Sequence, residues 1–365
     1  MNKTDKLYMK KALDLAERAR GRTSPNPMVG ALIVKSGRII AADYHRKAGS
    51  PHAEVLVLKK AGARALGATL YVTLEPCCHT LKKTPPCTDA IIKSGITEVV
   101  IAMIDPNPEV SGRGIKILRA AGIRTITGVL KYDARRLNEA FVKFISTGKP
   151  FVTLKIAQSL DGKIATARGE SKWITGHQAR NMVQKIRKGV DAILVGMGTV
   201  EKDDPSLDCR FNRGRNPYRI IVDSTLRIPL RAKVLKHADR KTIIATTDRA
   251  PDKKINDILK SGNRVIVLKA RKGRVDLKKL MKELGKLEIT SLLIEGGSSI
   301  SASVLSERLV DKVMFFSAPR IIGGEDAIPS VGGTSPSRLI SAIPVKDLRV
   351  MAVGKDVLIE GYPDY

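Results

Sequence analysis

Short apolar runs alternate with segments of helical spacing along the first 145 residues. Residues 28–45 ("MVGALIVKSGRIIAADYH") have apolar stretches on both sides of Ser36-Gly37 and predict a β-hairpin. Further strands are predicted over residues 69–75 and 98–105, and helices over residues 1–21, 53–65 and 114–122. Strands that alternate with helices in this way are typical of a layered α/β domain.

The stretch "STGKP" at residues 146–150 separates this region from a second series of apolar runs. Strands are predicted there over residues 151–157, 191–196, 218–223, 241–246, 263–268, 291–296 and 312–318. Helical stretches lie between most of them, so parallel strands joined by crossovers are the simplest arrangement. We therefore expect two different α/β domains, residues 1–147 and residues 151–365.

Length and composition agree with this division. A chain of 365 residues is long for one domain, and 43% apolar residues suffice for packed cores. No apolar run approaches the roughly 20 residues of a membrane span. The charged, amphipathic N-terminal segment lacks the apolar core of a signal peptide. We expect no membrane partner and a cytoplasmic location.

The net charge of +29 raises the question of a nucleic-acid partner. The excess is spread evenly, with +14 on residues 1–150 and +15 on residues 151–365. There is no basic tail and no RNA-recognition signature. We therefore expect a generally basic surface that favours anionic small-molecule substrates, rather than a dedicated polynucleotide partner.

Three of the four cysteines lie within eleven residues, close to a histidine-containing motif. His52-Ala53-Glu54 should open a helix, and Pro76-Cys77 should open a turn or helix after a strand, with Cys87 following. One imidazole and two thiolates can bind zinc and leave a fourth position for water, whose pKa zinc lowers to about 7. Glu54 can then carry protons from water to leaving ammonia. The H-x-E motif followed by Pro-Cys is typical of zinc deaminases that act on amino-pyrimidines and amino-purines.

Two less specific interpretations remain open for these residues. His-Ala-Glu alone is a weak signal for a metal site. A structural zinc site would prefer four protein ligands, and His79 could supply the fourth. Cys209 stands apart from the cluster and is expected to be an ordinary, partly buried thiol.

Longer motifs resemble one specific family, the bifunctional riboflavin-biosynthesis deaminase–reductases. In the first domain these motifs are "SPNPMVGALIV", "YHRKAGSPHAE", "YVTLEPCCHTLKKTPPCTDAI" and "DPNPEVSGRGIKILRAAGI". In the second they are "LKIAQSLDGKIA", "GESKWITG", "ILVGMGTVEKDDPSL", "IVDSTLRIP", "LLIEGGSSI" and "APRIIGG". The resemblance extends from about residue 5 to residue 330. It implies a cytidine-deaminase-like α/β/α domain followed by an α/β domain similar to dihydrofolate reductase.

For the first domain, the resemblance implies that His52, Cys77 and Cys87 bind zinc and that Glu54 shuttles protons. It also places Asn26 and His45 in the pocket for the pyrimidine. The chain departs from the family pattern in one place, because nine residues separate Cys77 from Cys87 where the family has eight. Cys78 would restore the spacing, but Glu75-Pro76 and His79 align with the family only if Cys77 is the ligand.

The second domain has one element that suggests phosphate binding without any comparison. In "SLLIEGGSSI" a strand runs into Gly296-Gly297 and a serine-rich helix start, where backbone amides can hold a phosphate. An ordinary tight turn would give the same pattern, and without G-x-G-x-x-G it does not indicate a Rossmann fold. Trp173, the single tryptophan, could equally be a packing residue.

The resemblance implies that this domain uses NADPH to convert the ribosyl group of a phosphorylated aminopyrimidine into a ribityl group. The positions that match NADP contacts are Ala157, Trp173, Thr199, Asp203, Ser224, Gly297, Ser298, Ser299, Ile300, Ser301, Ala302 and Ser303. Those that match contacts to the substrate are Lys155, Ser171, Arg187, Leu207, Arg210 and Glu295. The two arginines suit a phosphate, because a guanidinium binds oxyanions through two hydrogen bonds.

The predicted reaction sequence is deamination of 2,5-diamino-6-(5-phosphoribosylamino)pyrimidin-4-one at zinc, followed by reduction of 5-amino-6-(5-phosphoribosylamino)uracil. The alternative is a basic, zinc-dependent deaminase that acts on polynucleotides, which would leave the motifs of the second domain unexplained. A zinc-stabilised binding protein without activity is a further alternative, but Glu54 argues against it. The resemblance also implies a homo-oligomer.

Overall fold

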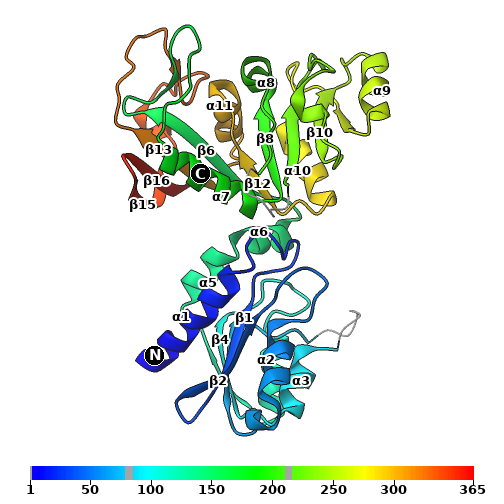
Figure 1. Ribbon diagram of the computed structural model, residues 1–365, viewed down its shortest axis with the longest axis vertical. Coiled ribbons are helices and arrows are strands. Elements are labelled where there is room, and N and C mark those ends of the chain that lie inside the picture. Colours follow the sequence, from blue (N-terminus) through cyan, green and yellow to red (C-terminus); the bar gives the residue numbers. More distant parts are fainter. Residues whose placement is uncertain (1, 79–84, 210–215) are drawn as a thin grey trace. The chain divides into compact units, whose positions relative to one another are not determined.

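The structure, a computed structural model, describes residues 2–78, 85–209 and 216–365 (Figure 1). Within it the chain forms two compact units, residues 1–148 and residues 149–365. Each unit has its own sheet and its own apolar core. None of the helices that the structure describes combines the length and the apolarity needed to span a bilayer.

The first unit has a five-stranded sheet with the order β2-β1-β3-β4-β5. The strands are β1 (Gly30–Lys35), β2 (Arg38–Tyr44), β3 (Thr69–Leu74), β4 (Glu98–Met103) and β5 (Arg124–Thr127). The predicted hairpin is confirmed, since β1 and β2 pair antiparallel on either side of Ser36 and Gly37. Both turn residues have positive φ, 50° and 74°, as a tight hairpin turn requires. Strands β3, β4 and β5 run parallel.

Helices cover both faces of this sheet and form the predicted α/β/α layers (Figure 1). They are α1 (Lys3–Glu17), α2 (Ala53–Ala61), α3 (Cys87–Lys93), α4 (Arg113–Ala120), α5 (Lys131–Leu137) and α6 (Glu139–Thr147), with a 3₁₀ turn at Gly62–Ala65. On one face α1 and α5 lie together, and on the other α2 and α3 pack side by side. Consecutive residues of the central strands, such as Ala31–Val34 and Val99–Met103, are buried, because both faces of the sheet are covered.

The second unit has a nine-stranded sheet with the order β11-β10-β9-β8-β12-β6-β13-β16-β15. Its strands are β6 (Phe151–Ser159), β8 (Ala192–Gly196), β9 (Tyr218–Val222), β10 (Thr242–Thr247), β11 (Arg264–Leu268), β12 (Ser291–Ile294), β13 (Lys312–Ala318), β15 (Val345–Val353) and β16 (Asp356–Pro363). Two short strands, β7 (Lys163–Ala165) and β14 (Ile328–Pro329), pair separately. The seven strands from β11 to β13 run parallel, as predicted.

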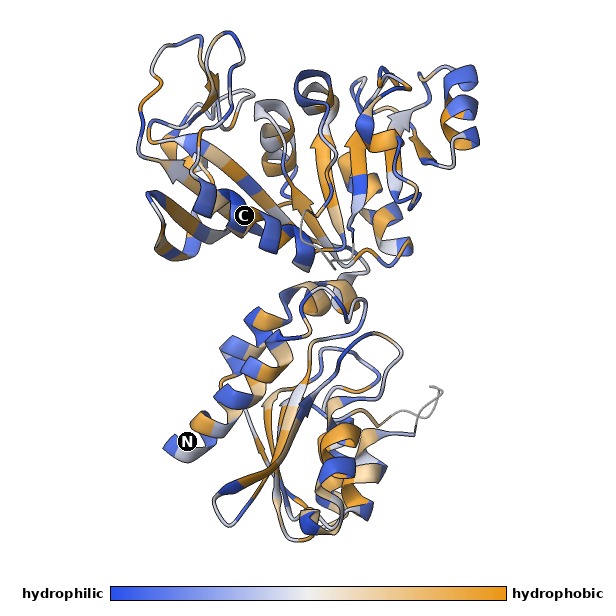
Figure 2. Cartoon of the chain, in the orientation of Figure 1, coloured by the Kyte–Doolittle hydropathy of each residue, from blue (hydrophilic) through white to orange (hydrophobic). Residues whose placement is uncertain are grey.

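Helices cover both faces of the parallel part of this sheet, which explains why its strands are apolar on both sides (Figure 2). They are α7 (His177–Gly189), α8 (Met197–Asp203), α9 (Asp252–Lys260), α10 (Leu277–Lys286) and α11 (Ser298–Ser306), with 3₁₀ turns at Lys233–Leu235 and Leu339–Ser341. In β8, Ala192 and Leu194 pack in the core with α10, whereas Ile193 and Val195 pack in the core with α8.

The antiparallel hairpin of β15 and β16 was not predicted. Strand β16 pairs with β13 and leaves β15 at the edge of the sheet. Most of β15 is exposed, so its sequence lacks the continuous apolar run by which the other strands are recognised.

Gly30 allows α1 to lie directly against the sheet. A Cβ at this position would lie 2.0 Å from the carbonyl oxygen of Ala12, so Gly30→Ala must push α1 away from β1. We expect the free energy of unfolding to fall by about 1–3 kcal/mol, the usual cost of overpacking. Chemical denaturation measures this change. Gly198→Ala is the control, because its added methyl group meets no atom within 4 Å; equal stability of both variants would contradict the prediction.

Candidate zinc and phosphate sites

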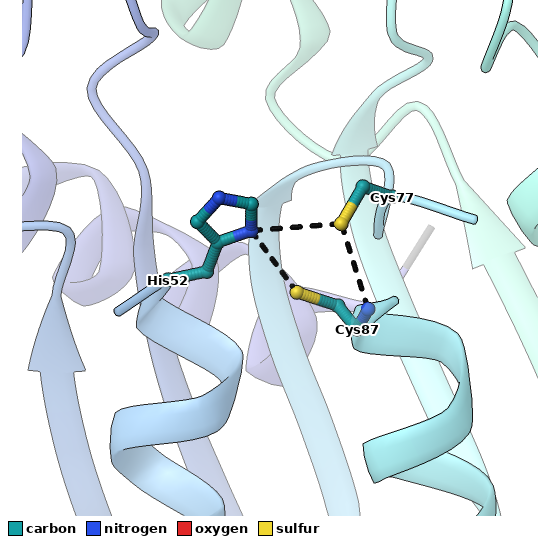
Figure 3. Close-up of side chains that lie close together, drawn as sticks. All are labelled: His52, Cys77 and Cys87. Atoms are coloured by element: carbon teal, nitrogen blue, oxygen red, sulfur yellow. Dashed lines mark hydrogen bonds between the residues drawn. The ribbon is translucent and has the colours of Figure 1, made fainter. Parts of the chain in front are cut away.

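His52 and Glu54 lie at the start of α2. His52 is the N-cap residue, with extended backbone angles, and it places its imidazole beyond the first turn of the helix (Figure 3). Glu54, one residue inside the helix, is only 4% exposed. A histidine and a carboxylate are thereby held by one rigid element beside the same site.

Cys77 and Cys87 reach this site from a loop and from a second helix start. Cys77 follows β3 in residues 75–78, which have no regular secondary structure. The turn or helix expected to open at Pro76-Cys77 would extend into residues 79–84, which lie outside the described residues. Helix α3 begins at Cys87, after Pro85-Pro86, because proline suits a helix start and disfavours helix at the residue before it. His79 lies outside the described residues.

The three ligand atoms are spaced as a zinc site requires. The Nδ1 atom of His52 lies 3.2 Å from the Sγ atom of Cys87 and 3.5 Å from that of Cys77 (Figure 3). All three atoms lie within 4.8 Å of one another. Tetrahedral zinc with bonds of about 2.3 Å to sulfur and 2.0 Å to nitrogen separates these atoms by about 3.5 Å. The donors therefore fit zinc, and Cys78 is not part of the group.

The protein polarises one of the two thiols toward its charged form. A hydrogen bond from Cys87 lowers the pKa of Cys77, burial opposes this shift, and His52 adds to it. The same hydrogen bond to Cys77 raises the pKa of Cys87. This hydrogen bond favours the thiolate form of Cys77, and the thiolate is the form in which a cysteine binds a metal.

Burial raises the pKa of Glu54, while His52 opposes the shift. Desolvation disfavours the charged carboxylate, and the nearby Cys77 sulfur adds to the same effect. A carboxyl group that can hold a proton above its ordinary pKa is suited to general acid–base catalysis.

His45 lies beside the ligand histidine. It is 2% exposed, and its ring meets that of His52 edge-on, with 5.6 Å between centroids. Nδ1 of His45 lies 3.2 Å from the carbonyl oxygen of Pro51, which suits a proton on Nδ1. Asn26 is half-buried in the turn before β1, where its backbone N–H donates to Thr23.

Glu75 supports the loop that carries Cys77, and sequence reasoning did not single it out. Its carboxylate is 2% exposed and accepts backbone N–H bonds from Asp105 (3.2 Å), Gly112 (2.9 Å) and Ile115 (3.3 Å). The backbone of Gly114 packs against the same loop, since a Cβ there would lie 2.2 Å from the carbonyl oxygen of Pro76. The loop is therefore fixed by contacts from about 30 to 40 residues further along the chain.

In residues 149–365 the carboxyl ends of β8, β9 and β12 open onto a cavity of about 1520 Å³. Most residues predicted for NADPH and substrate line it: Lys155, Ala157, Ser171, Trp173, Arg187, Thr199, Asp203, Leu207, Ser224, Glu295, Gly297, Ser298, Ser299, Ile300 and Ser303. Ser301 and Ala302 lie on the same helix but do not line the cavity, and Ser301 is fully buried. Arg210 lies outside the described residues.

Three charged side chains, each between 10% and 15% exposed, meet at one end of the cavity. Glu295 accepts two hydrogen bonds from the Arg187 guanidinium, at 2.7 and 3.0 Å, and lies 3.7 Å from the Lys155 ammonium. Burial alone would raise the pKa of Glu295, but Arg187 and Lys155 outweigh it and lower the pKa. Burial lowers the pKa of Lys155, and Glu295 opposes that shift. Two cations facing one anion leave a net positive charge, which favours an anionic ligand.

The predicted strand–turn–helix element is confirmed between β12 and α11. Gly297 is the N-cap residue of α11, with extended backbone angles. A Cβ on Gly296 would lie 1.7 Å from the side chain of Ile300, so only glycine fits this turn. The unpaired amides at the start of α11 thus face the cavity, where they can bind phosphate.

Trp173 is 59% exposed and lines the cavity, so it is not a core residue. The Arg180 guanidinium lies 4.6 Å from the centre of its ring. Next to it, Lys172 pairs with Asp203 at 3.0 Å. The indole therefore presents an aromatic surface at the cavity, held by a cation–π contact.

The family comparisons match both halves of the chain. Residues 2–103 match the family model described as the cytidine and deoxycytidylate deaminase zinc-binding region. Residues 150–359 match the model of the RibD C-terminal domain. The first match contains the zinc ligands, and the second contains the residues that line the large cavity.

Individual proteins are similar over nearly the whole length. The riboflavin biosynthesis protein RibD of Aquifex aeolicus is 46% identical over 356 residues, covering 97% of each chain. The structure of Acinetobacter baumannii RibD (form 1) aligns with a TM-score of 0.89 and 38% identity, over 100% of this chain and 99% of that one. A Thermotoga maritima crystal structure, described as a diaminohydroxyphosphoribosylaminopyrimidine deaminase/5-amino-6-(5-phosphoribosylamino)uracil reductase, aligns with a TM-score of 0.87, 38% identity and 99% coverage of both chains.

Replacing Glu75 tests its support of the zinc site. Glu75→Gln keeps the size of the side chain but replaces one acceptor oxygen by an NH₂ group that faces backbone N–H donors. We expect zinc affinity to fall about 10–100-fold, as for other residues that orient metal ligands. Competition with a chromogenic zinc chelator measures it. Glu109→Gln, on an exposed residue of the 105–112 loop, is the control; wild-type zinc affinity in folded Glu75→Gln would refute the assigned support.

Proposed function

The chain belongs to the RibD family, in which a zinc-dependent deaminase is joined to an NADPH-dependent reductase of riboflavin biosynthesis, and we propose how its residues divide the two reactions. Residues 1–147 would carry out deamination and residues 151–365 reduction. The two compact units of the fold support this division.

The proposed substrate of the first reaction is 2,5-diamino-6-(5-phosphoribosylamino)pyrimidin-4-one. Its deaminated product, 5-amino-6-(5-phosphoribosylamino)uracil, would be the substrate of the second. The activities named for the Thermotoga maritima relative support this assignment. The net positive charge of Lys155, Arg187 and Glu295 also suits a substrate with a phosphate.

In the deaminase domain, His52, Cys77 and Cys87 would hold the zinc ion. Zinc, when bound, supplies Lewis-acid activation of water at neutral pH. The Glu54 carboxylate would accept a proton at its Oε atoms and deliver it to the departing amine. Its raised pKa suits both transfers, because the group must be able to hold the proton in between. Thiol ligands stay reduced in the cytoplasm, which is the compartment that we propose.

His45 and Asn26 would orient the pyrimidine next to Glu54. His45 is fixed by its contacts with Pro51 and His52, so it can hold a ring substituent in a defined position. Asn26 can donate and accept hydrogen bonds at once, as recognition of a pyrimidine edge requires.

In the reductase domain, Lys155 and Arg187 would hold the phosphate of the substrate, and Glu295 would keep both cations in place. The amides at the start of α11, Gly297–Ser299, would hold a phosphate of the coenzyme. NADPH, when bound, supplies the hydride that converts the ribosyl group into a ribityl group. The other residues predicted for NADPH and substrate would shape the same cavity.

The observation that carries this proposal is the grouping of three zinc-ligand atoms, from His52, Cys77 and Cys87, beside the buried Glu54. Mass spectrometry tests the proposal. The zinc-loaded protein is incubated with the diaminopyrimidinone, with and without NADPH. Replacement of an amine by oxygen adds about 1 Da, and reduction adds about 2 Da more, as the two chemistries require. We expect the first change in both samples and the second only with NADPH.

Glu54→Gln separates the two reactions. It should lower the rate of deamination about 10²–10⁴-fold, the usual contribution of a general acid–base group. The same variant should still reduce the aminouracil when this is supplied directly, because Glu54 belongs to the other domain. If Glu54→Gln deaminates at the wild-type rate, Glu54 is not the proton shuttle. If the wild type changes neither mass, the proposed function is wrong.

We also propose that the protein is a homo-oligomer whose subunits meet along β15. This strand is the edge of the nine-stranded sheet, and Leu348 and Val350 on it are 59% and 68% exposed. Leu339 and Ile340, in the 3₁₀ turn before it, are 90% and 85% exposed. Exposed apolar groups on an edge strand favour pairing, and a second copy supplies the same strand to complete it.

Sedimentation velocity tests this assembly. Leu348→Lys/Val350→Lys should convert the oligomer into a monomer, because two charges would be buried in the interface. Leu259→Lys is the control, since this leucine of α9 is also exposed (47%) but lies on another element. A monomeric wild type, or an unchanged oligomer in the double variant, would refute the proposed interface.

A further inference from the structure

The large cavity of the reductase domain has a second cationic end that the residues assigned so far do not use. Four basic residues line it there: Arg227, Arg271, Lys272 and Arg274. Arg227 follows β9, and the other three belong to a short turn that follows β11. None of them was singled out from the sequence. Arg227 lies within the motif "IVDSTLRIP", which indicated no role for it, and the other three lie in a loop with no recognisable motif.

The turn has a defined geometry. The backbone N–H groups of Arg271 and Arg274 donate to each other's carbonyl oxygens, at 2.9 and 3.0 Å. Lys272 and Gly273 between them have φ values of 51° and 72°. This is the pattern of a two-residue hairpin turn with positive φ at both central positions. It places the two arginines side by side, with Lys272 at the tip.

Contacts with neighbouring segments hold the turn against the cavity. The N–H group of Val275 donates to the hydroxyl of Ser224 at 3.2 Å, and Val275 is buried. Arg249 donates to the carbonyl oxygen of Gly273 at 3.5 Å. Ser224 is one of the positions assigned to NADPH under the proposed function, so the turn lies next to the expected coenzyme.

The positive charge of the turn is only partly balanced. The Arg271 guanidinium lies 3.9 Å from the Glu307 carboxylate. Within the described part of the chain, Lys272 and Arg274 form no ion pair. At the other end of the cavity, by contrast, Glu295 neutralises one of two cations. The turn is therefore a place where an additional anionic group would be stabilised.

The position of the turn suits the adenosine half of a dinucleotide. Lys155 lies on β6 and Ser224 follows β9, and β12 and β8 lie between these strands in the sheet. Three strand spacings of about 4.8 Å separate the two ends by about 14 Å. The amides at the start of α11 follow β12, between the two ends. A coenzyme with its pyrophosphate at α11 therefore reaches toward the substrate on one side and toward the turn on the other.

We propose that the turn Arg271–Arg274 binds the 2′-phosphate of NADPH and makes the domain prefer NADPH over NADH. The two coenzymes differ only in this phosphate. Arginine binds phosphate through paired hydrogen bonds, and an uncompensated lysine adds charge. The proposal rests on the proposed function of the cavity as the reductase site.

Steady-state kinetics with both coenzymes test the proposal, with 5-amino-6-(5-phosphoribosylamino)uracil as substrate. Lys272→Gln/Arg274→Gln should lower the ratio of kcat/KM for NADPH to that for NADH by about 10-fold or more, the usual effect of losing a charged hydrogen bond. Lys253→Gln/Lys260→Gln removes two exposed charges of α9 that lie outside the cavity, and it should keep the wild-type ratio.

A binding measurement separates this proposal from the proposed function. Calorimetry compares 2′,5′-ADP with 5′-AMP, which lacks only the 2′-phosphate, on the wild type and the Lys272→Gln/Arg274→Gln variant. Tighter binding of 2′,5′-ADP that the variant loses supports the turn as the phosphate site, even if no reduction is observed. An equal loss for both coenzymes, a raised KM for the pyrimidine alone, or equal binding of the two nucleotides by the wild type would overturn the proposal.

Discussion

Unpaired backbone amides at helix starts are the constraint on which both candidate sites depend. The N–H groups in the first turn of a helix have no carbonyl partner within the helix. They therefore carry a partial positive charge that stabilises an anion placed next to them. In the first domain α2 and α3 place His52 and Cys87 at such positions. In the second, α11 begins at the cavity directly after Gly296-Gly297. A thiolate and a phosphate are both anions, so the same backbone feature serves a metal site and a nucleotide site.

The parallel strands determine where these helix starts gather. In a parallel sheet every crossover returns the chain to the same edge, so successive loops meet at the carboxyl ends of the strands. Cys77 follows β3, Ser224 follows β9 and Glu295 follows β12. Residues from distant parts of the sequence thus meet without long irregular segments. The buried strands provide the rigidity that holds the His52 and Cys87 ligand atoms 3.2 Å apart.

Site residues that are close together in the sequence, within one strand–turn–helix unit, could be predicted from the sequence. His52 with Glu54, and Gly296-Gly297 before α11, are recognisable because neighbouring residues define both the backbone and the chemistry. The support of Cys77 by Glu75 could not be predicted, since its three amide partners lie about 30 to 40 residues away. The start of α3 was not predicted either. It lies at Cys87, directly after Pro85-Pro86, because proline suits the first turn of a helix and disfavours helix at the residue before it.

The strongly basic composition does not by itself create a binding site for an anionic ligand. Exposed charges separated by more than about 8 Å are largely screened at physiological ionic strength. Most of the 65 basic residues can therefore do little for a bound phosphate. Lys155 and Arg187 differ because they are nearly buried, with 13% and 15% of their side chains exposed, so solvent screens them much less. The same burial requires a partner, because an isolated buried cation would be unstable, and Glu295 supplies it. A partly neutralised cluster in a cavity is thus more selective for a phosphate than a larger charge on the surface.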